Sequence, residues 1–218
     1  MLLKTEKLSY WYTNKEDYLF KDLSVEFTSG KVYAILGQSG SGKTTLLSLL
    51  SGLDNPKEGS VMYGNETIEK NGLTKYRQNS VSTIFQAYNL LTYMTARENV
   101  KTALEISGKS SQDETIEKLF EKVGIAKDLI DKPVLKLSGG QQQRVAIVRA
   151  LATNHEIIIA DEPTGNLDEK TTDDIVNIFR TIAHDEGKLV IIVTHEQSVA
   201  NQADFVYELS NKELVKIS

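Results

Sequence analysis

One stretch determines the architecture of this chain: Val32-Tyr-Ala-Ile-Leu36, followed by Gly37-Gln-Ser-Gly-Ser-Gly-Lys43-Thr44. An apolar strand, a glycine- and serine-rich turn and a helix over 44–51 are the context that the phosphate-loop pattern G-x-x-x-x-G-K-[ST] requires. Glycines let backbone N–H groups wrap a phosphate, and the helix adds its positive N-terminal end. A plain glycine-rich turn would leave the lysine and the hydroxyl unexplained, so the stretch predicts a nucleotide site.

The segments around this stretch alternate between strand and helix patterns. Alternating apolar and polar positions predict antiparallel strands at 2–8 and 19–27, with further strands at 59–63 and 81–85. Helix 138–153, strand 157–161, helix 169–184, strand 189–194 and helix 197–202 follow, then a final pair of short strands. This order is typical of an α/β fold with a doubly wound parallel sheet.

A helical pattern from about 88 to 136, with segments near 95–107 and 112–123, interrupts that alternation. It predicts an inserted helical lobe at 88–136, with 1–87 and 137–218 forming the core lobe of a single domain over 1–218.

Composition limits the classes of partner. The chain has 218 residues, a net charge of −5 at pH 7 and no cysteine. An acidic chain is not expected to bind nucleic acid, which needs clustered Lys and Arg, and disulfide or thiolate chemistry is excluded. No apolar run approaches the roughly 20 residues that span a bilayer, and charged residues interrupt the N-terminal apolar run, so no secretory signal is predicted.

The phosphate loop predicts its own ligands. Lys43 should reach the β- and γ-phosphates of a nucleotide, and the Thr44 hydroxyl should bind Mg²⁺. The loop residues predicted to contact the nucleotide are Gly37, Ser39, Gly40, Ser41, Gly42, Lys43, Thr44 and Thr45.

Two acids follow the apolar run Ile157-Ile-Ile-Ala160. A parallel strand delivers Asp161 to the carboxyl edge of the sheet beside the phosphate loop, where it can hold Mg²⁺ through oxygen. Glu162 is then placed to act as the general base on a water molecule. Two solvated acids at a strand end are the alternative, but the nearby phosphate loop favours the metal and the base.

Several further signals occur in a fixed order: Gln86 after an apolar strand, Leu137-Ser-Gly-Gly-Gln-Gln-Gln-Arg144, Gly165-Asn-Leu-Asp168 and Thr194-His195. With the phosphate loop and the acidic pair, they resemble ATP-binding cassette (ABC) ATPases over essentially the whole chain. The resemblance implies a P-loop NTPase parallel-sheet core, an N-terminal antiparallel β subdomain and an inserted α-helical subdomain. It implies ATP hydrolysis with ATP and Mg²⁺.

The resemblance also implies a role for each matching residue. Gln86 would touch Mg²⁺ and the attacking water, and His195 would contact the γ-phosphate as a switch. Asp168 would cross a dimer interface toward the opposite phosphate loop. The signature residues that would meet the ATP held by the other subunit are Ser138, Gly139, Gly140 and Gln141. Ser138 is also a good helix N-cap, so a merely capped helix is the alternative.

The resemblance further implies that an aromatic side chain near the N-terminus stacks on adenine. Tyr12 is the predicted residue, and Tyr10 and Trp11 are alternatives because the loop between Tyr12 and Phe20 has no fixed length. An ordinary strand aromatic is the structural alternative for all three.

Finer details resemble the group that includes LolD, MacB, FtsE and the antimicrobial-peptide-resistance ATPases. These details are the long turn before the helical lobe, LSGGQQQRVAIVRAL (137–151) and ADEPTGNLDEKT (160–171). The group implies a subunit at the cytoplasmic face of the cell membrane, as a homodimer or with a sister ATPase. It would bind an integral membrane permease through Gln86–Arg97, where Tyr88, Leu90, Leu91 and Tyr93 form an interface or, alternatively, pack inside the helical lobe.

Other functions fit less well. An FtsE-like regulator of cell-wall machinery remains an alternative, as does a soluble DNA- or ribosome-associated ABC protein, although one cassette without a heptad run disfavours the soluble classes. A small-molecule P-loop kinase would not explain LSGGQ or His195, and a pure binding module would be expected to lack Glu162.

Overall fold

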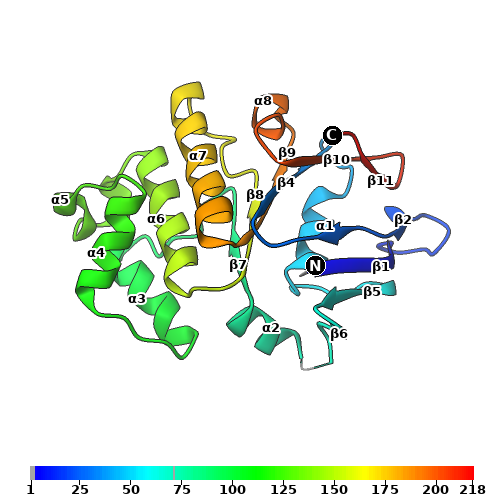
Figure 1. Cartoon of the computed structure of the whole chain (residues 1–218), viewed down its shortest axis with the longest axis horizontal. Helices are drawn as coiled ribbons and strands as arrows, with labels where there is room; N and C mark the ends of the chain where they lie inside the picture. Colours follow the sequence, from blue (N-terminus) through cyan, green and yellow to red (C-terminus); the bar gives the residue numbers. More distant parts are fainter. Residues whose placement is uncertain (1–2, 71) are drawn as a thin grey trace.

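The computed structural model describes residues 3–70 and 72–218, and its strands form two sheets (Figure 1). The larger sheet has the order β11-β10-β4-β9-β8-β7. Its strands are β4 (Lys31–Leu36), β7 (Val81–Ile84), β8 (Ile157–Asp161), β9 (Leu189–Thr194), β10 (Phe205–Ser210) and β11 (Glu213–Lys216). Only the β10–β11 pairing in this sheet is antiparallel, so the core is a parallel sheet as predicted.

The parallel strands are apolar on both faces, and successive side chains point into two different cores. In β8, Ile157 and Ile159 pack with α1 (Lys43–Leu50) on one side, and Ile158 and Ala160 pack with α7 (Glu169–Glu186) on the other. Because side chains alternate across a strand, a sheet covered on both faces needs such a continuous apolar run. The sheet is therefore held from both sides, and only its edges reach solvent.

The smaller sheet contains the N-terminal strands and is antiparallel, with the order β2-β1-β5-β6 and β3 paired to β1. Its strands are β1 (Leu3–Tyr10), β2 (Phe20–Leu23), β3 (Glu26–Phe27), β5 (Glu58–Tyr63) and β6 (Glu66–Thr67). The single strand expected over 19–27 is thus two strands. The expected start of the first strand at residue 2 lies outside the described residues.

Helices α3 (Ala96–Ile106), α4 (Asp113–Lys122) and α5 (Lys127–Ile130) and the turn η1 (Val134–Lys136) lie together at one end of the molecule (Figure 1). The helix α6 (Gly139–Ala152) packs against α3 and α4. A capping box fixes the start of α3, because Thr95 accepts from the Glu98 N–H while the Glu98 carboxylate accepts from the Thr95 N–H. The helical pattern expected from 88 begins only at 96, and 88–95 is irregular, with a turn at 92–93 and a bridge from Thr95 to Pro133.

The structure also corrects the sequence expectations at three places. Strand β6 (Glu66–Thr67) and helix α2 (Leu73–Asn79) form where no element was expected. Helix α7 runs two residues further than predicted, and α8 (Gln197–Ala200) ends two residues earlier. Among the residues that the structure describes, no helix is long and apolar enough to cross a membrane.

Candidate functional site

The predicted catalytic residues meet at one edge of the parallel sheet. Strands β4, β9, β8 and β7 are neighbours, and they end within one residue of each other in register, with Leu36 paired to Thr194, Asp161 to Val193 and Ile84 to Ala160. The carboxyl ends of parallel strands share an edge, so whatever follows each strand converges there. The phosphate loop, Glu162, His195 and Gln86 each follow one of these strands.

The phosphate loop carries the local geometry that its glycines permit. Gly42 is the N-cap of α1 with φ 101°, and a Cβ built on it would lie 2.9 Å from Leu19 Cγ. Lys43 is only 6% exposed, and its Nζ donates to the carbonyls of Gly37 and Gln38, both at 2.9 Å. These bonds hold the ammonium group across the loop, at its centre.

One buried hydroxyl in the phosphate loop lacks a hydrogen-bond acceptor in the part of the chain that the structure describes, and a nucleotide phosphate could supply one. Ser41 Oγ is buried and has no hydrogen-bond partner among the described residues. Unpaired buried hydroxyls are disfavoured by about 1–3 kcal/mol, so a partner from outside the chain is expected. The N-terminus of α1, the ammonium of Lys43 and this hydroxyl together offer the donors that phosphate oxygens accept.

Asp161 lies beside Thr44 in the arrangement expected for a divalent cation. Burial raises the pKa of Asp161, and a hydrogen bond from the Thr44 side chain partly opposes that rise. A carboxylate and a hydroxyl are the hard oxygen ligands that Mg²⁺ prefers, so this pair fits the ion.

Glu162 and His195 are in direct contact at the same edge. The Nδ1 of His195 donates to Oε1 of Glu162 over 3.1 Å, and the Glu162 N–H donates to the carbonyl of Val193 at 2.8 Å. Glu162 has φ 43°, in the left-handed region, which turns its side chain out of the line of β8. A carboxylate oriented by an imidazole suits a general base.

Thr164 and Glu196, which the sequence analysis did not single out, hold the turn that contains His195. The Glu196 N–H donates to Thr194 Oγ1 at 3.0 Å, and Thr164 Oγ1 donates to Glu196 Oε1 at 3.2 Å. The turn that presents His195 is therefore tied to the segment after Glu162. A Thr-His-Glu run directly after an apolar strand was the available signal.

Gln86 reaches the same place from β7. A Cβ built on Gly165 would lie 3.3 Å from Gln86 Nε2 and 3.7 Å from Glu162 Oε2, so both side chains approach one glycine. Next to them is a hollow of about 470 Å³, lined by Leu36, Gly37, Gln38, Ser39, Glu162, His195 and Glu208. Glu162 thus lies beside the phosphate loop, and Gln86 and Glu162 approach each other at Gly165.

The aromatic residues near the N-terminus differ sharply in exposure. Tyr12 is 69% exposed, and its hydroxyl lies 2.6 Å from Thr45 Oγ1 in α1. Tyr10 is buried and donates to Asp54 at 2.8 Å, while Trp11 packs edge-on against Tyr18. Of the three, Tyr12 alone combines an open ring with contact to the phosphate-loop helix, which favours it as the adenine partner.

The signature residues and Asp168 lie elsewhere, at the N-termini of α6 and α7. Ser138 caps α6 in a capping box with Gln141, and the side chain of Asp168 accepts from the Thr171 N–H at 3.0 Å and hydroxyl at 2.6 Å. A Cβ on Gly140 would lie 2.7 Å from Thr171 Cγ2, so the two helix N-termini are side by side. In Figure 1 both helices lie on the opposite side of the parallel sheet from α1.

The permease region predicted over Gln86–Arg97 is mixed. Tyr93 is 77% exposed, but Tyr88 and Leu90 pack against the core cluster of the helical part. Arg97 turns inward and donates to Asp131 at 2.7 Å and to Glu117 at 3.1 Å. Only part of the region is therefore free to meet another protein.

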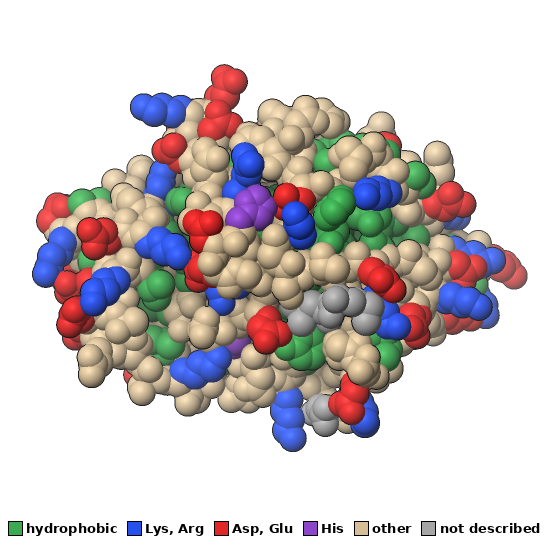
Figure 2. Space-filling view, viewed as in Figure 1, with side chains coloured by type: hydrophobic (Ala, Val, Ile, Leu, Met, Phe, Trp, Pro, Cys, Tyr) green, Lys and Arg blue, Asp and Glu red, His purple; other side chains and the backbone are tan. Residues whose placement is uncertain are grey.

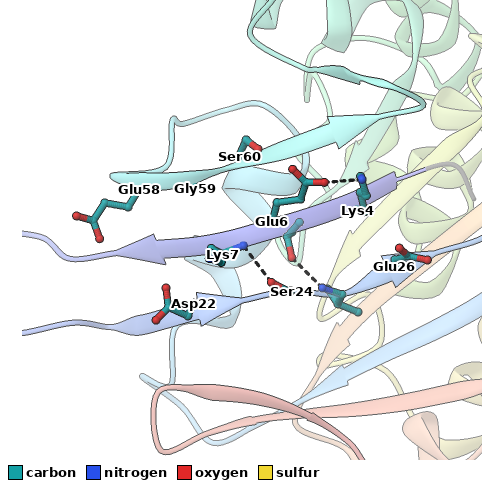
Figure 3. A pocket seen from close by; sticks show the side chains of 11 residues that line it. Lys4, Glu6, Lys7, Asp22, Ser24, Glu26, Glu58, Gly59 and Ser60 are labelled. Atoms are coloured by element: carbon teal, nitrogen blue, oxygen red, sulfur yellow. Dashed lines mark hydrogen bonds and ion pairs between the residues drawn. The ribbon is translucent and has the colours of Figure 1, made fainter.

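A larger hollow, of about 830 Å³, lies on the antiparallel sheet (Figure 3). Groups that line it bind one another: the Lys4 side chain pairs with Glu6 at 2.5 Å, and the backbone N–H of Lys7 donates to Ser24 Oγ at 3.0 Å. None of the predicted site residues lines it.

Comparisons with known proteins identify the family of this chain. A family model described as ABC transporter matches residues 20–165. The uncharacterized ABC transporter ATP-binding protein YclH of Bacillus subtilis (strain 168) is 50% identical, covering 96% of this chain and 93% of YclH. The lipoprotein-releasing system ATP-binding protein LolD of Rickettsia bellii (strain RML369-C) is 39% identical over 97% of this chain and 95% of LolD.

The macrolide export ATP-binding/permease protein MacB of Aggregatibacter actinomycetemcomitans is also 39% identical over 98% of this chain, which spans only 34% of MacB. Among solved structures, the dimeric bacterial ABC transporter cassette MJ0796 superposes with a TM-score of 0.87 at 33% identity, covering 98% of this chain and 96% of that one. The same cassette in a dimeric post-hydrolysis state bound to ADP and Pi gives a TM-score of 0.86 at 33% identity.

Proposed function

Because this chain belongs to the ABC transporter family and is an ATP-binding, ATP-hydrolysing subunit, we propose that two copies close head-to-tail around two ATP molecules. Closure and opening then drive a separate membrane permease. The core lobe, 1–87 and 137–218, carries the phosphate loop, and the helical lobe, 88–136, carries the permease contact.

One observation carries this proposal: a single chain holds two half-sites that do not face each other. The phosphate loop lies on the α1 side of the sheet, and the N-termini of α6 and α7 lie on the other side (Figure 1). Both are helix N-termini, which attract anions. A two-fold axis would bring the signature of one copy onto the phosphate loop of the other and complete two sites at once.

The hydrolytic step follows from the contacts at the sheet edge. Glu162 accepts a proton from the water that attacks the γ-phosphate, and His195, 3.1 Å away, orients that carboxylate. Lys43, Ser41 and the loop amides stabilise charge that develops on the phosphate oxygens. Gln86 positions the water. Mg²⁺, held by Thr44 and Asp161, would supply neutralising charge on the phosphate groups.

The γ-phosphate makes ATP bind the closed dimer more tightly than the open state, and this difference in affinity shifts the equilibrium between the two. It contacts the signature only in the closed dimer, so ATP favours closure and loss of the phosphate favours opening. Moving the population from 1:99 to 99:1 needs about 5.5 kcal/mol of such preference. Charge-assisted hydrogen bonds to Ser138 and to the amides of α6 supply energies of this order.

The relatives LolD and MacB are named for lipoprotein release and macrolide export, and we place this chain in the same kind of export or force-transmitting system. Tyr93, in the segment after Gln86, and Leu135, just before the signature, are large exposed apolar side chains that suit a protein interface. The permease would hold the chain at the inner face of the cell membrane.

The direct test is the variant Glu162→Gln. It should bind ATP, form a dimer and stall, because the general base is lost while the γ-phosphate contacts remain. Size-exclusion chromatography with light scattering in saturating Mg-ATP measures the dimer, and phosphate release measures the stall. A variant that stays monomeric would contradict the two-copy arrangement for the isolated chain.

The partner is identified by capture. Tagged Glu162→Gln protein, locked with Mg-ATP in detergent-solubilised native membranes, should co-purify with an integral membrane protein that mass spectrometry can identify. The matched control is Ser138→Arg in the same background, which should lose dimer-dependent partners. A ribosomal or DNA-associated partner in place of a membrane protein would overturn the transporter assignment.

A further inference from the structure

Arg149 of α6 binds two consecutive carbonyls in the segment that follows Gln86. Its Nη2 donates to Tyr88 O at 2.8 Å, and its Nη1 donates to Asn89 O. Tyr88 and Asn89 have φ values of 60° and 48°, both in the left-handed region. Two successive non-glycine residues in that region cost of order 1–3 kcal/mol each, so the surrounding structure must hold them there.

Among the described residues, the guanidinium of Arg149 binds only these two backbone carbonyls. Within residues 3–70 and 72–218, its two hydrogen bonds go to these carbonyls and no carboxylate pairs with it. Burial lowers the pKa of the guanidinium. A partly buried cation without a counter-ion is disfavoured for stability, and a plain structural contact would be served by a neutral donor.

A second residue grips the same segment from α3. Asn99 is buried, its Oδ1 accepts from the Leu91 N–H at 2.7 Å, and its Nδ2 donates to Leu91 O at 3.1 Å. The Tyr88 hydroxyl lies 3.1 Å from the position that a Cβ on Gly139 would take, at the start of the signature helix. The segment after Gln86 is therefore attached to α3 and to both ends of α6.

We infer that Arg149 is a positioning residue that links Gln86 at the catalytic edge to the signature helix α6. Only Ala87 separates Gln86 from Tyr88, so a displacement of Gln86 moves carbonyls that Arg149 holds rigidly. The C-terminal part of α6, which contains Arg149, then moves with these carbonyls. Because α6 is one helix, its N-terminus, capped by Ser138, moves as well. The inference rests on the proposed function of Gln86 and the signature.

The experiment compares Arg149→Ala and Arg149→Lys with the natural protein in steady-state ATP hydrolysis. The alanine variant should lose roughly 100-fold in kcat, as expected when a catalytic constellation is misplaced by about 1 Å. Its dissociation constant for a fluorescent ATP analogue should stay within about twofold, because the phosphate loop does not touch Arg149. The lysine variant should recover part of kcat, since an ammonium group can bind one carbonyl but not both in the fork geometry.

Chemical rescue provides a readout that a merely structural role would not move. Guanidinium at about 10 mM, too dilute to unfold typical domains, should restore kcat in Arg149→Ala and leave Gln86→Ala unchanged. The matched control is Arg180→Ala, an exposed position on α7, which should keep the natural kcat and dissociation constant.

The outcomes separate cleanly. Natural kcat in a folded Arg149→Ala, or equal losses of kcat, ATP affinity and thermal midpoint without rescue, would overturn the inference. If the alanine variant does not fold, a lysine variant with natural kcat overturns it as well. Full hydrolysis by Glu162→Gln in the same assay would instead overturn the proposed function itself.

Discussion

Gln143 is fully buried in α6, and neither its amide nitrogen nor its amide oxygen has a hydrogen-bond partner among the described residues. An unsatisfied buried amide is destabilising, so Gln143→Met should raise the free energy of unfolding by about 1–3 kcal/mol. Urea unfolding followed by circular dichroism measures it. Gln142→Met is the matched control, because Gln142 Nε2 donates to Leu137 O at 3.0 Å and its loss should not stabilise.

A stabilised Gln143→Met that also lost hydrolysis would show that Gln143 finds a partner in the closed dimer. If Gln143→Met lowered the free energy of unfolding, the Gln143 amide would have hydrogen-bond partners in the single chain, contrary to the structure.

His155 is buried and neutral, which makes the fold sensitive to acid. Its Nε2 donates to Gln78 O at 2.9 Å, its Nδ1 lies 3.0 Å from Ser82 Oγ, and burial lowers its pKa from the ordinary 6.5, with Lys109 adding to the effect. Below pH 6.5 the unfolded chain therefore binds more protons than the folded chain, and stability falls as the pH falls.

We expect the natural protein to lose more free energy of unfolding between pH 7.5 and 5.5 than His155→Gln, by at most about 1.4 kcal/mol, because only about one pH unit of this interval lies below the ordinary pKa of 6.5. Urea titrations of both proteins at the two pH values give this double difference. Parallel losses in both proteins would mean that other groups carry the acid sensitivity.

Helix α7 begins directly after Asp168, which caps the helix and has a predicted role across the dimer interface. The exposed carboxylate of Asp168 caps the helix by accepting a hydrogen bond from the Thr171 N–H. Asp168→Ala should cost about 1 kcal/mol of stability, whereas Asp168→Asn keeps the cap and should cost only a few tenths. If the proposed role across the dimer is correct, both variants weaken the ATP-dependent dimer measured by light scattering. A natural dimer in Asp168→Asn would leave Asp168 with the cap alone.

The elements that the sequence predicted are those with long local patterns. Strands β8 and β9 are unbroken apolar runs, and the acids and the histidine directly after them are easy to place at a sheet edge. Helix α2 was missed because its seven residues are too few to show a helical repeat and Gly72 at its N-cap offers no capping side chain. The segment 88–95 was expected to be helical, but it is irregular, held by the nearby Asn99 and by Arg149, which is about 60 residues away in sequence, and no local pattern encodes the second contact.

The residues of the site were predictable for a related reason. Gln86, Glu162 and His195 each lie within two residues of the end of an apolar strand, and Lys43 follows the apolar strand β4 through the phosphate loop, so sequence position sets their place in space. The left-handed conformation of Glu162 and the contact of Gln86 with Gly165 depend on packing between separate strands and loops, and only the structure shows them.

Across the whole molecule, charges of both signs are interspersed on the face shown in Figure 2, without a single dominant basic area. One ion pair, Lys122 to Glu186, ties α4 of the helical part to α7, and Arg144 of α6 bridges the two by binding Asp174 of α7 at 3.0 Å and the carbonyl of Val123. The helical part is thus fastened to the core at its outer side as well as through the segment after Gln86.

The assembly is tested most sharply at the exposed Ser138. In the Glu162→Gln background, Ser138→Arg should keep ATP binding and abolish the dimer, because a bulky cation would occupy the place of the opposite γ-phosphate. Isothermal titration measures the first and light scattering the second. Ser138→Ala is the control, since it loses the cap at a cost of about 1 kcal/mol without the bulk. Equal loss of ATP binding and dimer in Ser138→Arg would contradict the assigned roles.

The left-handed backbone of Glu162 has an evolutionary consequence. Glycine adopts that conformation freely, whereas a side chain there is strained by about 1 kcal/mol or more. Replacement by glycine would therefore relax the chain while removing its base. A population of this protein selected only for heat resistance would drift toward that change, and only continued demand for turnover keeps the glutamate in place.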